Sequence, residues 1–74
     1  MAISRISRRE KLSRYIKTAR DQKGLSQEQA AKIIGVSRDR FGAWERNPDM
    51  IQLGKLRIVC LALGVDITEL VAIK

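Results

Sequence analysis

Residues 25–46, LSQEQAAKIIGVSRDRFGAWER, decide the fold of this chain. Ser26 is followed three residues later by Gln29, and this pair forms a capping box, so a helix is predicted to begin directly after Ser26. At Gly35 a left-handed turn is expected, because glycine has no Cβ to clash there. Ser37 can cap the next helix, which is predicted to run to the end of the stretch. Two short helices therefore follow each other across a tight turn.

Small and apolar residues stand where these two helices must meet. Ala31 is small at the expected crossing point, and Val36 buries the apolar side of the turn. Four larger side chains are expected to pack between the helices: Ile33, Ile34, Phe41 and Trp44. The place of Trp44 in this apolar row favours core packing over stacking on bases. Two short helices joined by a glycine-containing turn are the geometry of a DNA-binding helix-turn-helix.

A further helix is predicted before this stretch, from about Arg8 to a left-handed cap at Gly24. Its apolar side chains recur at i, i+4 and i+7, the spacing of one helical face, and are Leu12, Ile16 and Ala19. The preceding residues, 1–7, are polar and basic, and they are expected to form a flexible arm.

Two more helices are predicted after the stretch. Pro48 ends the preceding helix, since proline cannot continue one. A fourth helix begins near Gln52 or Leu53, ends at Gly64, and is expected to turn these side chains inward: Leu53, Leu56, Val59, Cys60 and Leu63. Asp66 can cap a last short helix over residues 67–71. The predicted fold is all-α, a compact bundle of five short helices in one domain spanning residues 1–74.

Basic residues dominate the charge. Fifteen Lys and Arg stand against eight Asp and Glu, a net charge of +7. Residues 1–23 carry eight basic and two acidic residues, so most of this excess (+6) lies in the N-terminal third. Such a balance favours a polyanionic partner, either nucleic acid or an anionic membrane surface.

Several classes of function are not expected from this composition. The chain has no His, no nucleophile with a partner base and no Gly-rich phosphate loop, so we expect no enzyme and no cofactor. Its single cysteine, Cys60, can form neither an internal disulfide nor a metal cluster, and it is expected in the core. No apolar run approaches the ~20 residues of a membrane span. No signal peptide is evident, and a cytoplasmic protein without a membrane partner is expected.

The chain resembles the Cro-like and lambda-type phage repressor family of helix-turn-helix regulators, also known as the xenobiotic-response-element family, which includes restriction–modification controller proteins. The resemblance covers about residues 12–70. It rests on Leu25-Ser26-Gln27, Ala30-Ala31, Gly35-Val36-Ser37, Trp44-Glu45-Arg46, Leu53, Leu56 and Leu63-Gly64-Val65. It implies a five-helix fold, with helices two and three forming the motif, and a transcription regulator that binds duplex DNA through the major groove.

The same resemblance implies which residues touch DNA. The positions that face base edges are Arg38, Asp39, Gly42 and Ala43. The positions that contact phosphates are Gln27, Ser37, Arg40, Arg46, Gly54 and Lys55. Arg38 is the best candidate for direct readout, because a guanidinium pairs bidentately with guanine O6 and N7. Asp39 either accepts from cytosine N4 or orients Arg38. Gly42 and Ala43 are short, which implies close approach with fewer base hydrogen bonds. The alternative is that these arginines form a solvated helix face and do not contact DNA.

Two further expectations concern the fold and its assembly. The resemblance implies an ion pair between Arg20 and Glu45 that holds the reading helix at a fixed angle; the alternative is two independent surface charges. A set of apolar residues exceeds what so small a core needs, and it is expected to form a homodimer interface: Ile58, Leu61, Ile67, Val71 and Ile73. The alternative is that Ile67 and Leu70 simply close the core. Such a dimer would bind an inverted-repeat site.

Other functions remain open at this point. An antitoxin-type interaction module, which neutralises a partner protein, is the main alternative to a DNA-binding regulator, and a pull-down or toxin-inhibition assay discriminates the two. RNA binding lacks support, because base stacking needs exposed aromatics and the chain has only three aromatic residues. A phage repressor, a restriction–modification controller and a small host regulator fit equally well. No small-molecule effector is expected.

Overall fold

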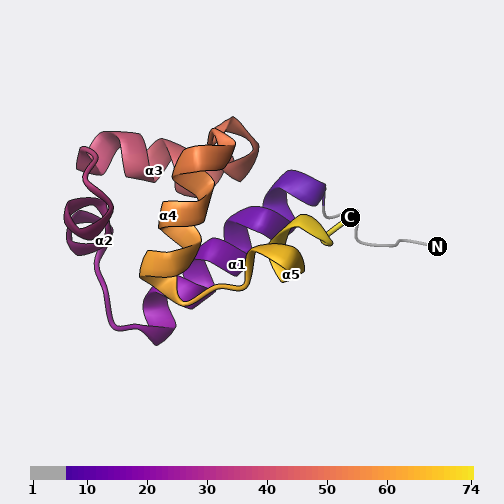
Figure 1. Ribbon diagram of the computed structural model, residues 1–74, viewed down its shortest axis with the longest axis horizontal. Helices are drawn as coiled ribbons and strands as arrows, with labels where there is room; N and C mark the ends of the chain where they lie inside the picture. The colour runs from indigo at the N-terminus through magenta and orange to yellow at the C-terminus, as the bar shows by residue number, and fades with distance from the viewer. Residues whose placement is uncertain (1–6) are drawn as a thin grey trace.

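The computed structural model describes residues 7–74 and is all-helical over that range. Figure 1 shows α2 and α3 together at one end of the molecule, with α5 beside α1 and the last residues at the other. Along the chain the elements are α1 (Arg8–Gln22), α2 (Gln27–Ile34), α3 (Arg38–Arg46), the 3₁₀ helix η1 (Pro48–Met50), α4 (Leu53–Leu63) and α5 (Ile67–Val71). The predicted all-α architecture, with helices two and three forming the motif, is confirmed.

Short polar side chains start most of these helices. The capping box is present at α2, where the Ser26 hydroxyl accepts from the Gln29 amide and the Gln29 side chain accepts from the Ser26 amide. At α3 the Ser37 hydroxyl accepts from the Arg40 amide, and at α5 the Asp66 carboxylate accepts from the Thr68 amide, in both cases without the reciprocal bond. Ser7 caps α1 and therefore belongs to that helix rather than to the predicted arm. The rest of the arm, residues 1–6, lies outside the described residues.

The turn between α2 and α3 depends on a glycine. Gly35 has φ +92°, a left-handed conformation in which a Cβ would be strained, and its amide donates to Ala31 O at 2.8 Å. This cap ends α2 after only eight residues. The chain then enters α3 at once, so the two helices are held at a fixed crossing.

One apolar core joins the helices. Its most completely buried large side chains come from three different elements: Ile16 of α1, Phe41 of α3 and Val59 of α4. Cys60 is buried among them, as predicted. Trp44 is also buried, which settles its role as a core residue. Within the helix-turn-helix, α3 thus packs on α1 and α2 packs on α4.

Two predicted core residues are exposed. Leu53 is 69% exposed, although it shares the angular position of Cys60, because it is the first residue of α4 and lies at the end of the stripe. Ile33 is 58% exposed, since Ala30, Ala31 and Ile34 occupy the inward face of α2. Helical periodicity predicts the direction in which a side chain points. The side chain is buried only if another element of the fold also packs against it.

Candidate nucleic-acid interface

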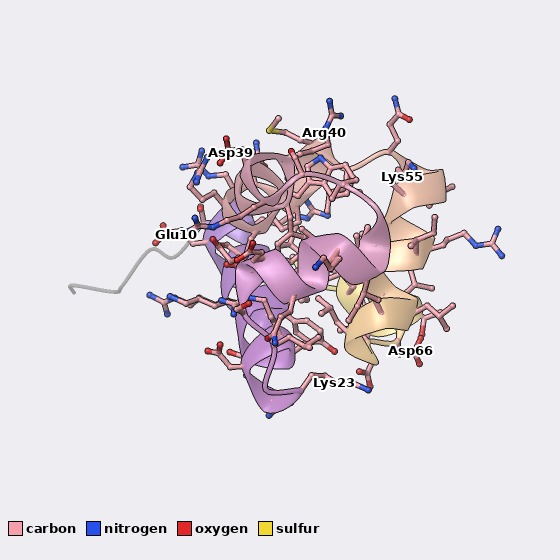
Figure 2. The ribbon with its side chains drawn as sticks, turned by 90° about the vertical axis from the view of Figure 1, so that its left-hand side faces the viewer. Glu10, Lys23, Asp39, Arg40, Lys55 and Asp66 are labelled. Atoms are coloured by element: carbon pink, nitrogen blue, oxygen red, sulfur yellow. The ribbon has the colours of Figure 1, made fainter. Side chains whose placement is uncertain are left out.

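The start of α3 presents charged side chains to solvent. Arg38, Asp39 and Arg40 are all exposed. Figure 2 shows Asp39, Arg40 and Lys55 along one edge of the molecule, with Lys23 at the opposite end. Among residues 7–74, no hydrogen bond or ion pair joins Asp39 to Arg38, so the guanidinium is not held by its neighbour. The first turn of α3 therefore projects freely.

A buried network fixes the position of α3. Arg20 Nε donates to Glu45 Oε2 at 2.6 Å, and Arg20 Nη2 lies 3.4 Å from Glu45 Oε1. The residues are only 8% and 5% exposed. The hydrogen bond to Glu45, opposed by desolvation, raises the pKa of the Arg20 guanidinium above its usual value. The two predicted partners thus form an ion pair that ties α1 to α3.

The same network reaches α2, which the sequence did not reveal. Gln27 Nε2 donates to Glu45 Oε1 at 2.8 Å, and Arg20 Nη1 donates to Leu25 O at 2.7 Å. Glu45 therefore joins the last turn of α3 to both of the preceding helices. Each of its carboxylate oxygens accepts a hydrogen bond, so the buried charge is matched by donors. This arrangement holds α3 at a set angle to α1 and α2.

A hollow of about 300 Å³ lies between the start of α2 and the outer face of α3. It is lined by Gln27, Arg38, Asp39, Gly42 and Arg46. Gly42 is buried at this place, contrary to the expectation of an exposed position, because Gln27 and Arg46 cover it. A Cβ on Gly42 would lie 3.7 Å from Arg46 Nη1 and 3.8 Å from Gln27 Oε1. Ala43 is half-buried beside it.

A second hollow, of about 350 Å³, lies between α3 and the start of α4. It brings together Arg40 and Lys55 over the edge of Trp44. Gly54 is exposed in the first turn of α4, and no side chain caps the amides of that turn. Free amides at a helix N-terminus favour an anion. The structure thus places two predicted phosphate-contact residues, Arg40 and Lys55, around one opening, and Gly54 precedes Lys55 in the chain without lining it.

Comparison with protein families agrees with this geometry. A family model described as helix-turn-helix matches residues 16–70. The chain belongs to the Cro/C1-type helix-turn-helix family. It is accordingly a DNA-binding transcription regulator, and the family is typically non-enzymatic. A search of curated protein sequences finds no significant match.

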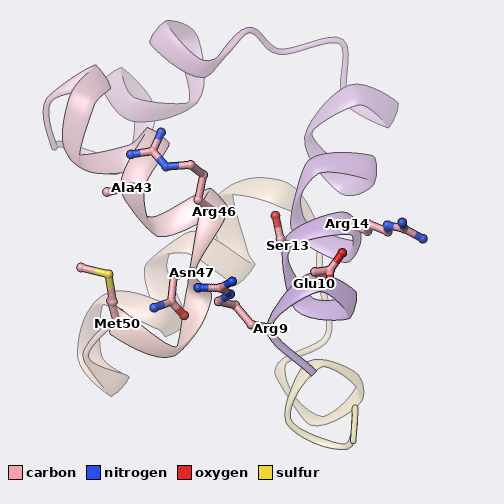
Figure 3. A pocket seen from close by; sticks show the side chains of 8 residues that line it. All are labelled: Arg9, Glu10, Ser13, Arg14, Ala43, Arg46, Asn47 and Met50. Atoms are coloured by element: carbon pink, nitrogen blue, oxygen red, sulfur yellow. The ribbon is translucent and has the colours of Figure 1, made fainter. Parts of the chain in front are cut away.

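A third hollow of this helix-turn-helix regulator was not anticipated from its sequence. It measures about 460 Å³ and separates the start of α1 from the end of α3 and η1 (Figure 3). Arg9 and Ser13 line it from α1, and Arg46 and Asn47 line it from the other side. The sequence carries one hint, since Arg9 and Ser13 are one helical turn apart, but nothing in the spacing shows that they face α3.

Within residues 7–74, the arginines of the regulator fall into two groups. Arg8 forms an ion pair with Asp49 and donates to Ile73 O, and Arg20 is held by Glu45. In the second group the guanidinium makes no hydrogen bond or ion pair to any described residue; the group comprises Arg9, Arg14, Arg38, Arg40, Arg46 and Arg57. Five members of that group line the three hollows around α3: Arg9, Arg14, Arg38, Arg40 and Arg46.

The predicted dimer residues divide into exposed and half-buried ones. Leu61 is 84% exposed, and Ile58 and Val71 are also exposed. In contrast, Ile67 and Ile73 are half-buried and pack against the core. The expectation that the core does not need these two residues is therefore wrong. Leu70 is buried and closes the core. In the regulator as described, an apolar surface therefore remains on α4 and α5, and it is smaller than predicted.

None of the helices in residues 7–74 is long and apolar enough to cross a membrane. Within the same range, no cluster of His, Cys, Asp or Glu residues is placed to hold a metal ion.

Proposed function

We propose that the protein binds an inverted-repeat DNA site as a homodimer and regulates transcription there, with α3 in the major groove. One observation carries this proposal: the exposed face of α3 is bordered by hollows that gather unpaired cations. Guanidinium groups without an internal partner are available to phosphates and base edges. Duplex DNA as the partner places the proposed activity in the cytoplasm, in a phage, restriction–modification or host setting.

Base readout is assigned to the first two turns of α3. Arg38 is exposed and unpaired among the described residues, so it can form two parallel hydrogen bonds to guanine. Asp39 lies beside it and can accept from a cytosine amino group. The Ala43 methyl can contact a thymine methyl. Gly42 is covered by Gln27 and Arg46, so its missing side chain gives those two side chains room beside α3 and does not itself contact a base.

Phosphate contacts are assigned on both sides of α3. The Gln27 amide uses one hydrogen on Glu45 and keeps a second one for a phosphate. The Ser37 hydroxyl accepts from the Arg40 amide and can still donate outward. The remaining contacts come from Arg46 in one hollow, from Arg40 and Lys55 in the other, and from the uncapped Gly54 amide in the first turn of α4.

Dimerisation is assigned to the apolar face of α4 and α5. Ile58, Leu61 and Val71 are exposed there, and half-buried Ile67 and Ile73 extend the same C-terminal set. A two-fold interface is self-complementary, so this surface would meet its own copy. The reading helices of such a dimer would lie about one DNA turn, ~34 Å, apart.

The decisive experiment selects bound duplexes from a random pool and then measures affinity at several salt concentrations. An enriched inverted repeat is expected. With roughly six to ten phosphate contacts, binding should weaken about 10³- to 10⁵-fold between about 50 and 200 mM salt. Failure to enrich any duplex would overturn the proposed function, and a flat salt dependence would overturn the phosphate assignments.

The dimer is tested separately by sedimentation of the wild type, Leu61→Asp and Ile33→Asp. Leu61 and Ile33 are both exposed apolar residues, but Ile33 lies on α2, away from the assigned interface. Leu61→Asp should sediment as a monomer, while Ile33→Asp should remain dimeric. A wild type that stays monomeric at high micromolar concentration, yet binds a single half-site tightly, would contradict the dimer.

A further inference from the structure

The hollow between α1 and α3 has the composition of an anion site. Three guanidinium groups line it, those of Arg9, Arg14 and Arg46, against the single carboxylate of Glu10. None of the three is engaged by another described residue. Cations gathered around a concave surface without partners repel one another, and an external anion relieves that repulsion.

The charged side chains that line this hollow point in different directions. Arg9 reaches from α1 toward Asn47, whereas Arg14 points away from α3 and Glu10 lies beside it (Figure 3). Glu10 also accepts a hydrogen bond from the Ser7 hydroxyl at 3.4 Å, at the start of α1. Arg46 also lines the hollow, but its guanidinium is turned toward Ala43 and away from α1 (Figure 3). The positive charge that faces the hollow therefore comes mainly from Arg9, with the carboxylate of Glu10 turned to one side.

Neutral donors complete the lining. Ser13 and Asn47 are half-buried on opposite walls, and neither side chain has a hydrogen-bond partner within residues 7–74. A hydroxyl and an amide can each donate to a phosphate oxygen without adding charge. One guanidinium with two neutral donors suits a single phosphodiester group.

The position of the hollow identifies the source of that phosphate. Arg46 lines both this hollow and the one that contains Arg38 and Gly42, so the two openings adjoin along α3. A DNA strand lying on the reading face would continue past the end of α3 and over the start of α1.

We propose that this hollow binds a backbone phosphate of DNA outside the base pairs that α3 reads, with Arg9 as the principal ligand. The inference rests on the proposed function and extends it, because it adds to the contact surface a helix that lies outside the helix-turn-helix. Affinity gained in this way is independent of base sequence.

The test compares Arg9→Ala with Lys23→Ala on the selected duplex. Both variants lose one positive charge from the α1 region, but Lys23 lies at the opposite end of the molecule from the reading face (Figure 2). Arg9→Ala should reduce the slope of log affinity against log salt by about one per protomer. Lys23→Ala should leave the slope unchanged, and both variants should keep the wild-type melting temperature.

Duplexes with a single neutral methylphosphonate locate the contact. One neutralised phosphate beyond the recognised base pairs should weaken wild-type binding severalfold and leave Arg9→Ala unaffected, because the variant has already lost that contact. If wild-type and Arg9→Ala proteins respond alike to every substitution, the site is wrong while the proposed function stands. A wild type that binds no duplex at all would overturn both.

Discussion

The two ends of the contact between α1 and α3 use the same residue type in opposite ways. At one end Arg20 is buried against Glu45, with Gln27 as a third partner. At the other end Arg9 faces an open hollow, and its guanidinium has no partner among residues 7–74. The difference is that a buried carboxylate, that of Glu45, pairs with Arg20, whereas no carboxylate of the described residues pairs with Arg9. A buried guanidinium with a carboxylate becomes part of the fold, and an exposed one without a carboxylate remains available to an external anion.

Removal of the buried carboxylate should have the largest effect. Glu45→Ala leaves the Arg20 charge buried without its partner, which costs about 3–5 kcal/mol of unfolding free energy. In a domain of this size each kcal/mol shifts the melting temperature by roughly 4–8 °C. Thermal unfolding followed by circular dichroism measures the change. A wild-type melting temperature in this variant would show that the two charges are not coupled.

Among the unpaired arginines, Arg38 and Arg46 should differ in specificity. Arg38→Ala is expected to cost about 1–3 kcal/mol on the selected site and much less on random DNA, because it removes a base contact. Arg46→Ala should weaken binding to both by similar factors, because it removes a phosphate contact. Binding titrations with the two duplexes measure this. Equal losses on both duplexes for Arg38→Ala would rule out its reading role.

Gly42→Ala should separate stability from binding. The added methyl meets Arg46 and Gln27 only at ordinary contact distances, and alanine favours a helix interior by about 0.5–1 kcal/mol over glycine. The melting temperature should therefore rise, while affinity for the selected duplex should fall, because the methyl takes up space that the Gln27 and Arg46 side chains need to turn toward phosphates. Unchanged or improved affinity would show that this space does not serve binding.

The smallest effect is expected at Arg8, the neighbour of Arg9. Arg8 pairs with Asp49 at a half-exposed site, and exposed ion pairs contribute about 0–1 kcal/mol. Arg8→Ala should lower the melting temperature by a few degrees at most and leave the salt slope of DNA binding close to that of the wild type. If Arg8→Ala reduced the salt slope as much as Arg9→Ala does, paired and unpaired arginines would contribute equally to DNA binding, which would contradict the comparison.

Most of the secondary structure followed from local chemistry. Capping residues such as Ser26 and Ser37 act within one helical turn, and Gly35 adopts its left-handed conformation because of its own missing Cβ. Each of these interactions involves only a few adjacent residues, so it can be predicted from the sequence alone. The Arg20–Glu45 pair was expected only through family resemblance, since 25 residues separate the two and no local rule connects them.

Only the tertiary structure decided which side chains were covered, paired or left free. Leu53 and Ile33 have apolar side chains but no element packs over them, and Gly42 is covered by side chains from its own helix and from α2. Arg8 and Arg9 are adjacent and chemically identical, yet one is paired with Asp49 of η1 and the other faces a hollow. The sequence by itself determined the helices, their ends and the excess of positive charge, because these depend on neighbours along the chain. The pairing and exposure of each charge depend on neighbours in space, and those exist only after the helices have packed.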